Sequence, residues 1–465
     1  MNRSVLLALA CLCVAIAVLA VRPVRTPGPF ARDFEAYWSA GVTQNAGLDP
    51  YGREIWKAER GIAGVDARRP EPLPFVGPPH TLAAWSLAAR VPYQTAAYVW
   101  WSALVLSLLA LTAAVIRCSG VPFEPPTLLG GIVLAIAFAP LSSDLALGQL
   151  ALPAFLGAVL VVALADRSLP AAALAASLAF AQPNAALALV SQLGRNRATA
   201  AISAGAVFAY LLGARMRGWD WPLWYVRHAA AHAAAERFTA IQFGPAAIAY
   251  DFGASPAAAT AIAVVAALLA AAAAVAIAVA VADRFARFAG FAALTPFVAG
   301  FFHEHDLLVA FAPALWCALR TKGTTRALAL AGTLLAGVDW LGLAQRPSGI
   351  VQSALLGAAA SLAFIALGED AEFRIAVPVA GAAAALMGCA ALVAVRHPVP
   401  VWPDALPAIA LPATAPIAAV WFDEQRASGL LAAVPAWGLL RSFSLLGSAL
   451  LAYAIYRRPS CCRTA

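Results

Sequence analysis

Acidic and aromatic side chains are concentrated just after the first hydrophobic segment, in residues 31–41, which read Ala-Arg-Asp-Phe-Glu-Ala-Tyr-Trp-Ser-Ala-Gly. A carboxylate at the end of a membrane span is well placed to remove a proton from a hydroxyl group that reacts with a lipid-borne substrate, which is the task of a general base. Asp33 is the leading candidate for this base, and Glu35 is the second choice. The alternative for Asp33 is structural, because aspartate is common at helix N-caps.

A second group of polar residues follows two phenylalanines at the end of an apolar segment and consists of His303, Glu304, His305 and Asp306. Ionisable residues in or near a membrane span are functional candidates by default. Three interpretations stay open. His303 or His305 donates hydrogen bonds to a departing phosphate, the His-x-His pair and its carboxylates ligate a metal, or the segment is an interfacial polar loop.

Two glutamines are further candidates for phosphate contact, since an amide donates hydrogen bonds without bringing charge. Gln149 stands at the start of an apolar segment, and Gln182 lies in a short hairpin. The residues around Asp33 that are expected to contact an acceptor or to support the loop are Glu35, Tyr37, Trp38 and Tyr51.

The overall composition places these residues in an integral membrane protein. Of the 465 residues, 63% are hydrophobic and 12% are charged, and the mean hydropathy is +0.80. A soluble surface needs about twice that share of charge. The net charge of +8 comes from lysines and arginines scattered between apolar runs. This pattern indicates membrane lipids as partners and excludes a basic face for nucleic acid.

About fourteen hydrophobic segments can be distinguished between polar breaks, where each span needs roughly twenty apolar residues to cross the hydrocarbon core. The sequence therefore predicts an all-α, multi-pass membrane protein with a single domain, residues 1–465. The clearer segments are 5–21, 96–116, 199–212, 256–282, 307–319, 351–367, 376–395 and 439–456, and the shorter ones include 128–141, 150–165, 171–181 and 183–193.

Positive charges in the short loops favour a cytoplasmic N-terminus. This orientation puts three sizeable loops outside, at about 23–95, 213–255 and 396–430, with tryptophan and tyrosine typical of amphipathic interfacial helices. The first segment also has the pattern of a cleavable signal peptide, which is the less favoured interpretation. In either case residue Asp33 is predicted to lie outside.

The Asp-Phe, Tyr-Trp, Ala-Gly and Asp-Pro-Tyr series of residues 33–51 resembles the first outer loop of glycosyltransferase family 87. These are polyprenyl-phosphate-sugar-dependent enzymes, mannosyltransferases among them, with the type C membrane glycosyltransferase fold. The resemblance implies an inverting single displacement from a polyprenyl monophosphate sugar to a lipid or glycan acceptor outside the plasma (inner) membrane. It implies Asp33 as the base and requires no metal and no cofactor.

The sequence departs from this family at two places. Relatives often carry Lys-Pro where this chain has Gln182 and Pro183, so the expected cation is missing there. The two histidines also stand further beyond Thr295-Pro296 than the family pattern suggests, which leaves open whether His303 or His305 contacts phosphate.

Nucleotide-binding motifs such as a P-loop or a GxGxxG turn are missing from the sequence, which favours an activated lipid as the donor of a hexose or pentose. A transporter or flippase of lipid-linked sugars is the alternative, because broken helices and polar groups near spans would look similar. A catalytically inactive interaction protein on the same scaffold is a third possibility.

Overall fold

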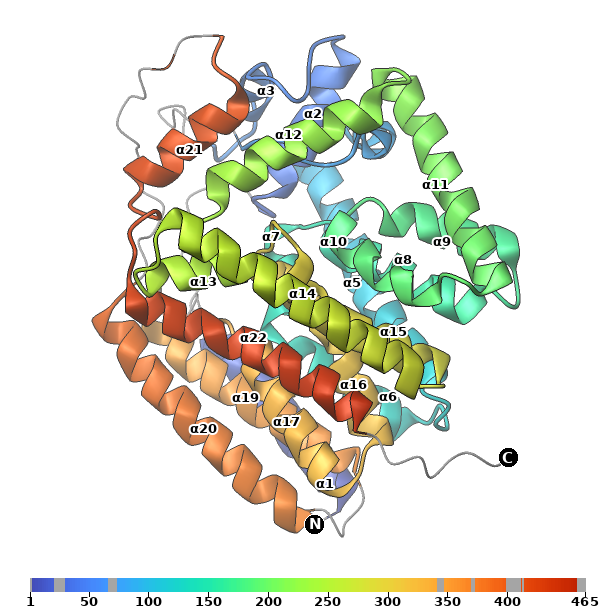
Figure 1. The fold of residues 1–465 in the computed structure, drawn as a ribbon, viewed down its shortest axis with the longest axis vertical. Helices are drawn as coiled ribbons and strands as arrows, with labels where there is room; N and C mark the ends of the chain where they lie inside the picture. The colour runs from blue at the N-terminus through green and yellow to red at the C-terminus, as the bar shows by residue number, and fades with distance from the viewer. Residues whose placement is uncertain are drawn as a thin grey trace.

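The computed structural model describes residues 2–20, 30–65, 73–340, 347–368, 373–398, 411 and 414–457, and these residues form helices, turns and loops without a β-strand. Figure 1 shows the helices gathered into one body. The predicted all-α class is therefore confirmed for this part of the chain. Parts of the predicted outer loops, at 23–29, 66–72, 399–410 and 412–413, lie outside the described residues.

Four helices of the described residues are long and apolar enough to cross a membrane. The bent pair α6 (Pro125–Ala137) and α7 (Ala139–Leu147), which turns by 68°, adds a fifth if it is counted as one broken span. This criterion supports a membrane protein but does not confirm fourteen spans. The four helices are α5 (Tyr93–Cys118), α11 (Asn196–Arg217), α14 (Pro256–Ala280) and α22 (Pro435–Tyr456).

Capping side chains of serine or aspartate, and a proline in the first turn, explain where several helices begin. Ser255 accepts a hydrogen bond from the backbone N–H of Ala258 at 3.3 Å, and Pro256 occupies the first turn of α14. Asp283 caps α15 (Arg284–Val298) in the same way through Ala286, at 2.8 Å. Such side chains satisfy backbone donors that have no partner inside the helix.

The helical body is packed through small residues. A Cβ atom added at Gly447 of α22 would lie 2.5 Å from the backbone nitrogen of Ala336 in α17 (Gly323–Gly337). Close approach of this kind is typical of membrane helices, where packing replaces the hydrophobic effect. The first helix, α1 (Arg3–Ala20), packs on α19 (Pro347–Ala366) and α6 and so belongs to the same body. Other members are α8 (Ala151–Leu164), α9 (Leu169–Ala179), α16 (Phe311–Arg320) and α20 (Phe373–Arg396).

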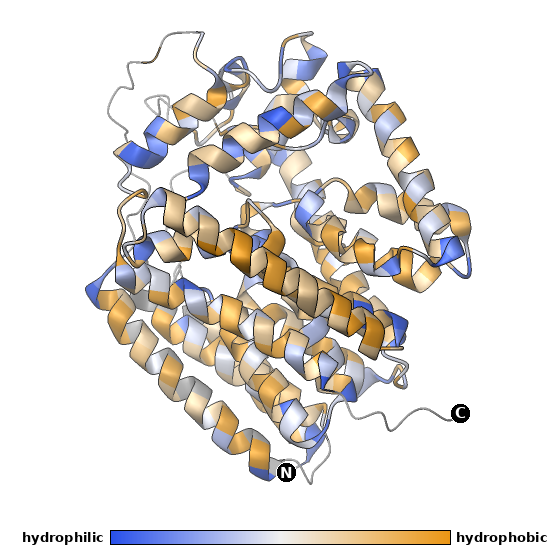
Figure 2. Cartoon of the chain, in the orientation of Figure 1, coloured by the Kyte–Doolittle hydropathy of each residue, from blue (hydrophilic) through white to orange (hydrophobic). Residues whose placement is uncertain are grey.

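The predicted outer loops contain short helices, as their composition indicated. Figure 1 shows α2, α3, α12 and α21 together at one end of the molecule, above the apolar helices that dominate the lower part in Figure 2. An aromatic core of Phe34, Tyr51, Phe75, Trp85 and Tyr93 holds the first loop together. The helices are α2 (Phe34–Asn45), α3 (Ile55–Glu59), α4 (Leu82–Ala88), α12 (Trp221–Glu236), α13 (Pro245–Asp251) and α21 (Ile417–Ala427), with the 3₁₀ turn η1 (Pro79–Thr81).

One of the clearer predicted spans, 307–319, is replaced by shorter elements, and the shorter segment 183–193, for which a tilted, broken or re-entrant helix was expected, is also divided. Segment 183–193 forms α10 (Pro183–Ala186) and the 3₁₀ helix η2 (Leu187–Gln192), and segment 307–319 is divided between the 3₁₀ helix η3 (His305–Ala310) and α16. All residues from Phe311 to Ala318 are buried inside the protein. Apolar stretches of this length are more typical of buried or re-entrant helices than of spans.

Candidate functional site

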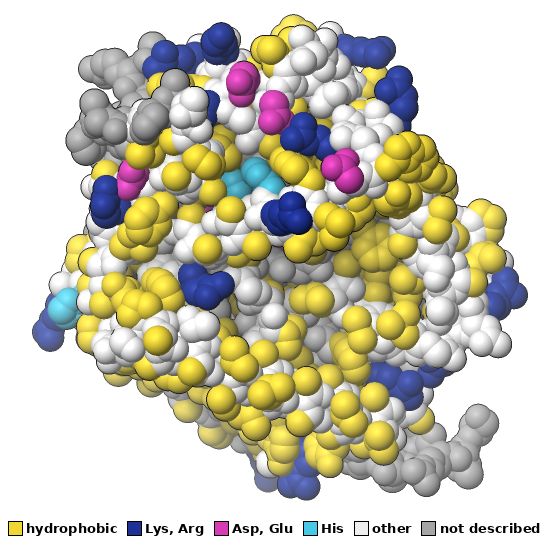
Figure 3. Space-filling view, turned by 45° about the horizontal axis from the view of Figure 1, so that its top comes forward, with side chains coloured by type: hydrophobic (Ala, Val, Ile, Leu, Met, Phe, Trp, Pro, Cys, Tyr) yellow, Lys and Arg dark blue, Asp and Glu magenta, His cyan; other side chains and the backbone are white. Residues whose placement is uncertain are grey.

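A cavity of about 780 Å³ lies where the loop helices meet the helical body. Its walls combine the start of α2, the α7–α8 and α9–α10 turns, one face of α12, the segment before η3, and α21. Figure 3, with this end turned forward, shows histidine side chains exposed between basic and acidic side chains. The residues predicted from the sequence that line the cavity are Asp33, Tyr37, Gln149, Gln182, His303 and His305.

Asp33 stands at the N-cap position of α2, but its side chain makes no capping hydrogen bond. Instead, Oδ2 of Asp33 accepts a hydrogen bond from Nε2 of Gln149 at 2.5 Å. The hydroxyl of Tyr37 donates to Oε1 of the same glutamine at 2.7 Å, which fixes the direction of its amide. The interpretation of Asp33 as a capping side chain is therefore wrong, and its carboxylate belongs to a network in the cavity wall.

A tight backbone crossing brings Gln149 to Asp33. Gly148 ends α7 with φ of 76°, and a Cβ atom there would lie 2.8 Å from the Cβ of Ala31. Ala31 itself has φ of 55°, which is uncommon for a residue with a side chain and costs conformational energy. The backbone N–H of Asp33 donates to the carbonyl of Leu147 at 2.9 Å, so the two segments are bonded directly.

Another part of the wall is organised around Asp306, at the start of η3. Its carboxylate accepts hydrogen bonds from Gln182 Nε2 at 3.0 Å, Asn184 Nδ2 at 3.2 Å and the backbone N–H of His303 at 2.9 Å. Gln182 thus lies in the cavity wall as expected, but the amide nitrogen predicted to contact phosphate is bonded to Asp306. These bonds hold the histidine segment against the α9–α10 turn.

His303 is paired with Glu236, a buried residue at the end of α12. The His303 Nε2 atom lies 2.7 Å from Glu236 Oε2. The same carboxylate accepts hydrogen bonds from Gln242 Nε2 at 2.8 Å and from the indole N–H of Trp421. Gln242 is fixed in turn, because its Oε1 accepts from the backbone N–H of Phe302 at 2.8 Å.

The charges of this pair follow from its surroundings. Burial alone would lower the pKa of His303, but the adjacent Glu236 carboxylate outweighs burial and the pKa is raised. Burial alone would raise the pKa of Glu236, but the charge and hydrogen bond of His303, with the bonds from Trp421 and Gln242, lower it. The two shifts together favour the charged pair, with His303 as imidazolium and Glu236 as carboxylate. In contrast, burial lowers the pKa of His305, so that ring is favoured as neutral.

Ligand atoms of His303, His305 and Asp306 all lie within 4.8 Å of one another, and by residue type these three side chains could hold a divalent ion. The present hydrogen bonds already occupy much of this donor set, since Asp306 accepts three of them and His303 faces Glu236. The arrangement is therefore accounted for as a hydrogen-bonded network, and the metal interpretation is left to a test with chelator.

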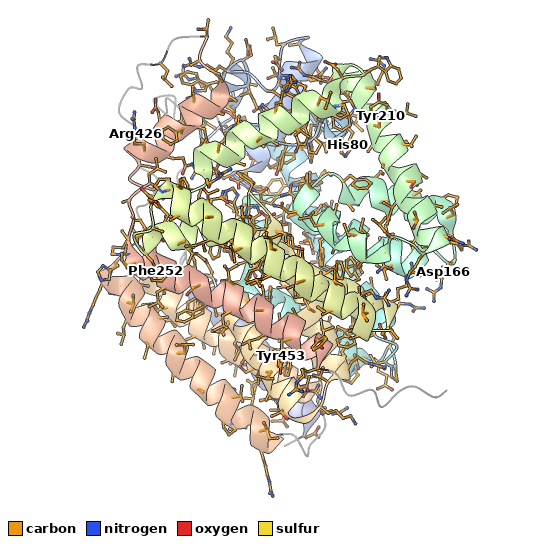
Figure 4. The ribbon with its side chains drawn as sticks, in the orientation of Figure 1. His80, Asp166, Tyr210, Phe252, Arg426 and Tyr453 are labelled. Carbon is orange, nitrogen blue, oxygen red and sulfur yellow. The ribbon has the colours of Figure 1, made fainter. Side chains whose placement is uncertain are left out.

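A buried arginine supports the His303 wall from outside the cavity. Arg441 of α22 is 1% exposed and pairs with Asp251 of α13, which is also 1% exposed. Its guanidinium also donates to the carbonyl of Thr239 at 3.0 Å and to that of Gln242. Figure 4 shows α22 running from near Phe252 toward Tyr453, so this clamp lies at its upper end.

Three residues predicted near the acceptor lie outside the cavity lining. The indole N–H of Trp38 donates to the carbonyl of Val91 at 3.1 Å, and the hydroxyl of Tyr51 donates to that of Gly77 at 2.9 Å. Glu35 is fully buried within the loop. From the sequence, these side chains were expected either to contact an acceptor or to support the loop, and their positions agree with support of the loop.

Sequence reasoning missed Glu236, Gln242, Trp421 and the Arg441–Asp251 pair. Glu236 ends an alanine-rich stretch and belongs to no recognisable motif. Arg441 could have been found, because it is a lone charge within the predicted span 439–456, and a charge in a span is a functional candidate.

Replacing Glu236 by glutamine is expected to lower the pKa of His303, because the amide keeps the size of the side chain but loses the charge that holds the imidazolium. The ion pair contributes between the lowered pKa of Glu236 and the raised pKa of His303, and it is lost as pH rises through the latter. NMR titration of isotope-labelled histidine side chains in detergent would follow this change. The control is Glu54→Gln, which changes an exposed glutamate. If the pKa of His303 is the same in Glu236→Gln as in the wild type and this control, the pairing is contradicted.

Comparison of the chain with protein-family models, with curated proteins and with solved structures finds no match in any of the three.

Proposed function

We propose that this chain is an inverting membrane glycosyltransferase with a type C fold, located in the plasma (inner) membrane. It transfers a hexose, with mannose as one candidate, or a pentose from a polyprenyl monophosphate sugar to a hydroxyl of an extracytoplasmic lipid or glycan. The observation that carries the proposal is the Asp33 carboxylate, which Gln149 orients in the wall of a cavity that His303, paired with Glu236, also lines.

The proposed step is a single displacement. Asp33 takes the proton of the acceptor hydroxyl while the acceptor oxygen bonds to the anomeric carbon of the sugar. The bond from that carbon to the phosphate oxygen breaks on the opposite face, and its electron pair leaves with the polyprenyl phosphate. His303, held as imidazolium by Glu236, favours the negative charge that builds on this leaving group.

The membrane arrangement supports this assignment. Four or five helices are long and apolar enough to span, and the cavity lies at the end where the predicted outer loops gather. Short loops predicted to be cytoplasmic carry Arg117, Arg167, Arg284 and Arg320, as the positive-inside rule expects. The cavity is thus proposed to open on the extracytoplasmic side, where a lipid donor is reached in the plane of the membrane.

The purified protein in lipid nanodiscs is tested with the polyprenyl monophosphate esters of mannose, glucose and arabinose. It is expected to convert one of these three donors to polyprenyl phosphate. Cell-envelope lipids serve as acceptors, no nucleotide sugar is added, and mass spectrometry follows both products. The reaction should continue in EDTA. Transfer from a nucleotide sugar alone would overturn the lipid donor, and loss of transfer in EDTA would show that the metal interpretation of His303, His305 and Asp306 is the right one.

The bent pair α6 and α7 is the feature that would suit a transporter, because discontinuous helices line many transport sites. That alternative predicts movement of the lipid-linked sugar across the membrane without cleavage. Reconstituted vesicles in which the sugar lipid crosses the bilayer intact, with no polyprenyl phosphate released, would favour the transporter over the enzyme.

A further inference from the structure

Arg32 lines the cavity directly before the proposed base, and no described residue pairs with its side chain. Within the described residues its guanidinium makes no hydrogen bond or ion pair, and its Nε atom is shut off from solvent with no acceptor. The adjacent Asp33 carboxylate is instead held by Gln149. A buried donor left without an acceptor costs free energy, so such a group in a native structure calls for an explanation.

Two other arginines near this end of the molecule contact aromatic rings. Arg217 pairs with Asp49 at 3.5 Å and lies over the ring of Trp224, 4.1 Å from its centroid. Arg60 covers the ring of Trp56 at 4.0 Å. Arg90 and Arg227 have no partner among the described residues either, but both are exposed to solvent. Arg32 differs from them because its Nε atom is shut off from solvent at the cavity wall.

The backbone around Arg32 is held in place. The residue before it, Ala31, has the positive φ described above, and the residue after it donates its backbone N–H to Leu147. The carbonyl of Arg32 accepts from the N–H of Glu35 at 3.2 Å. The fixed backbone keeps the side chain at the cavity wall, and the planar guanidinium at its end offers paired N–H donors that match two oxygens of one phosphate group.

The charges of the cavity wall limit the ligand. Among the described lining residues, Arg32 carries the one permanent positive charge. Glu236 is balanced by His303, and burial with the neighbouring Asp339 raises the pKa of Glu304, which favours its neutral form. A diphosphate brings at least one more negative charge than a monophosphate, both in the sugar-linked donor and in the free lipid. Among the described lining residues no second permanent cation would balance that charge, and the Asp33 carboxylate beside Arg32 would repel it. The carboxyl groups in the lining belong to Asp33, Glu236, Glu304 and Asp339.

We propose that Arg32 binds the phosphate of the lipid donor, and that the site takes a polyprenyl ester with one phosphate in preference to a diphosphate. This inference rests on the proposed function for the identity of the lipid. Arg32 is then the phosphate ligand, and His303 is a second cationic residue in the cavity wall. From the sequence alone, the candidates for phosphate contact are only the two histidines, Gln149 and Gln182.

The test measures binding of undecaprenyl monophosphate to the full-length protein in nanodiscs, by quenching of tryptophan fluorescence. Undecaprenyl diphosphate, phosphatidylglycerol and inorganic phosphate are titrated in parallel. Arg32→Gln is expected to weaken monophosphate binding by at least about tenfold, the loss that accompanies removal of a charge-assisted hydrogen bond. Arg32→Lys should recover part of the affinity, because it restores the charge without the fork of donors.

Arg90→Gln is the matched control, since Arg90 is exposed in the same loop and is not a lining residue. The Arg90→Gln variant should bind undecaprenyl monophosphate with the same affinity as the wild type. Equal monophosphate affinity in Arg32→Gln and the wild type would overturn the role of Arg32 while leaving the proposed enzyme intact. Arg32-dependent binding of inorganic phosphate without binding of either polyprenyl lipid would support the anion site and overturn the lipid donor. Tighter binding of the diphosphate would overturn the preference for one phosphate.

Discussion

Asp33→Asn is expected to lower the turnover number by at least about 100-fold, the lower range for loss of a general base. The amide keeps the size of the side chain and can still accept a hydrogen bond from Gln149, but it cannot take up the acceptor proton at neutral pH. Because the Asp33 side chain does not cap α2, folding and donor binding should remain normal. Single-turnover release of polyprenyl phosphate, with binding measured separately, separates the two effects.

Glu35→Gln is the internal comparison for this experiment. Glu35 lies in the same motif but is buried within the loop and does not line the cavity. The Glu35→Gln variant should therefore keep a much higher turnover number than Asp33→Asn, provided that both variants fold equally well. An active Asp33→Asn beside an inactive, folded Glu35→Gln would move the base by two positions, and activity in both variants would remove the catalytic role from this loop.

Arg441→Met should destabilise the protein by about 3–5 kcal/mol, the usual cost of breaking a buried ion pair from one side. The change leaves the Asp251 carboxylate buried without its cation, and the carbonyls of Thr239 and Gln242 lose their donor. Because Gln242 holds both Glu236 and the Phe302 backbone, activity should fall even at temperatures where the variant stays folded. Equilibrium unfolding in mixed micelles, followed by tryptophan fluorescence, measures the loss.

Two further variants show whether the buried pair is the cause. Arg457→Met removes an exposed arginine at the end of the same helix and should change stability by no more than about 0.5 kcal/mol. The double variant Arg441→Met with Asp251→Leu removes both charges and should be more stable than Arg441→Met alone. A double variant that is less stable than the single one would contradict an uncompensated Asp251 as the main cost.

The site was predictable where chemistry and local sequence coincide. Asp33 stands out because an acidic residue follows a span within an aromatic motif, and the histidines stand out at the end of another segment. The structure confirms that they share a cavity with Gln149, while their chemical roles stay predictions. Glu236 was not predictable, since it approaches His303 only through folding, 67 residues away in the chain.

The helical class was predictable from composition, but the number of spans was not. Hydropathy sums the apolar content of a segment and does not distinguish lipid from protein as the surroundings. In α8, which is 14 residues long, eleven residues are buried inside the protein. In α14, by contrast, an exposed apolar side chain such as Val279 is 83% accessible, as expected for a helix facing lipid. Only the packing of neighbouring helices separates these cases.

The position of Arg441 has a consequence for biosynthesis. The last described residue of the cavity wall is Leu430, whereas the arginine that clamps the Gln242 turn comes later, in α22. A ribosome that has made every residue of the wall has therefore not yet made its clamp, and the growing chain holds an unpaired Asp251 until α22 joins the bundle. Nascent chains stalled between residues 430 and 441 should be recognised as immature by membrane proteases, although they contain every described residue of the cavity wall.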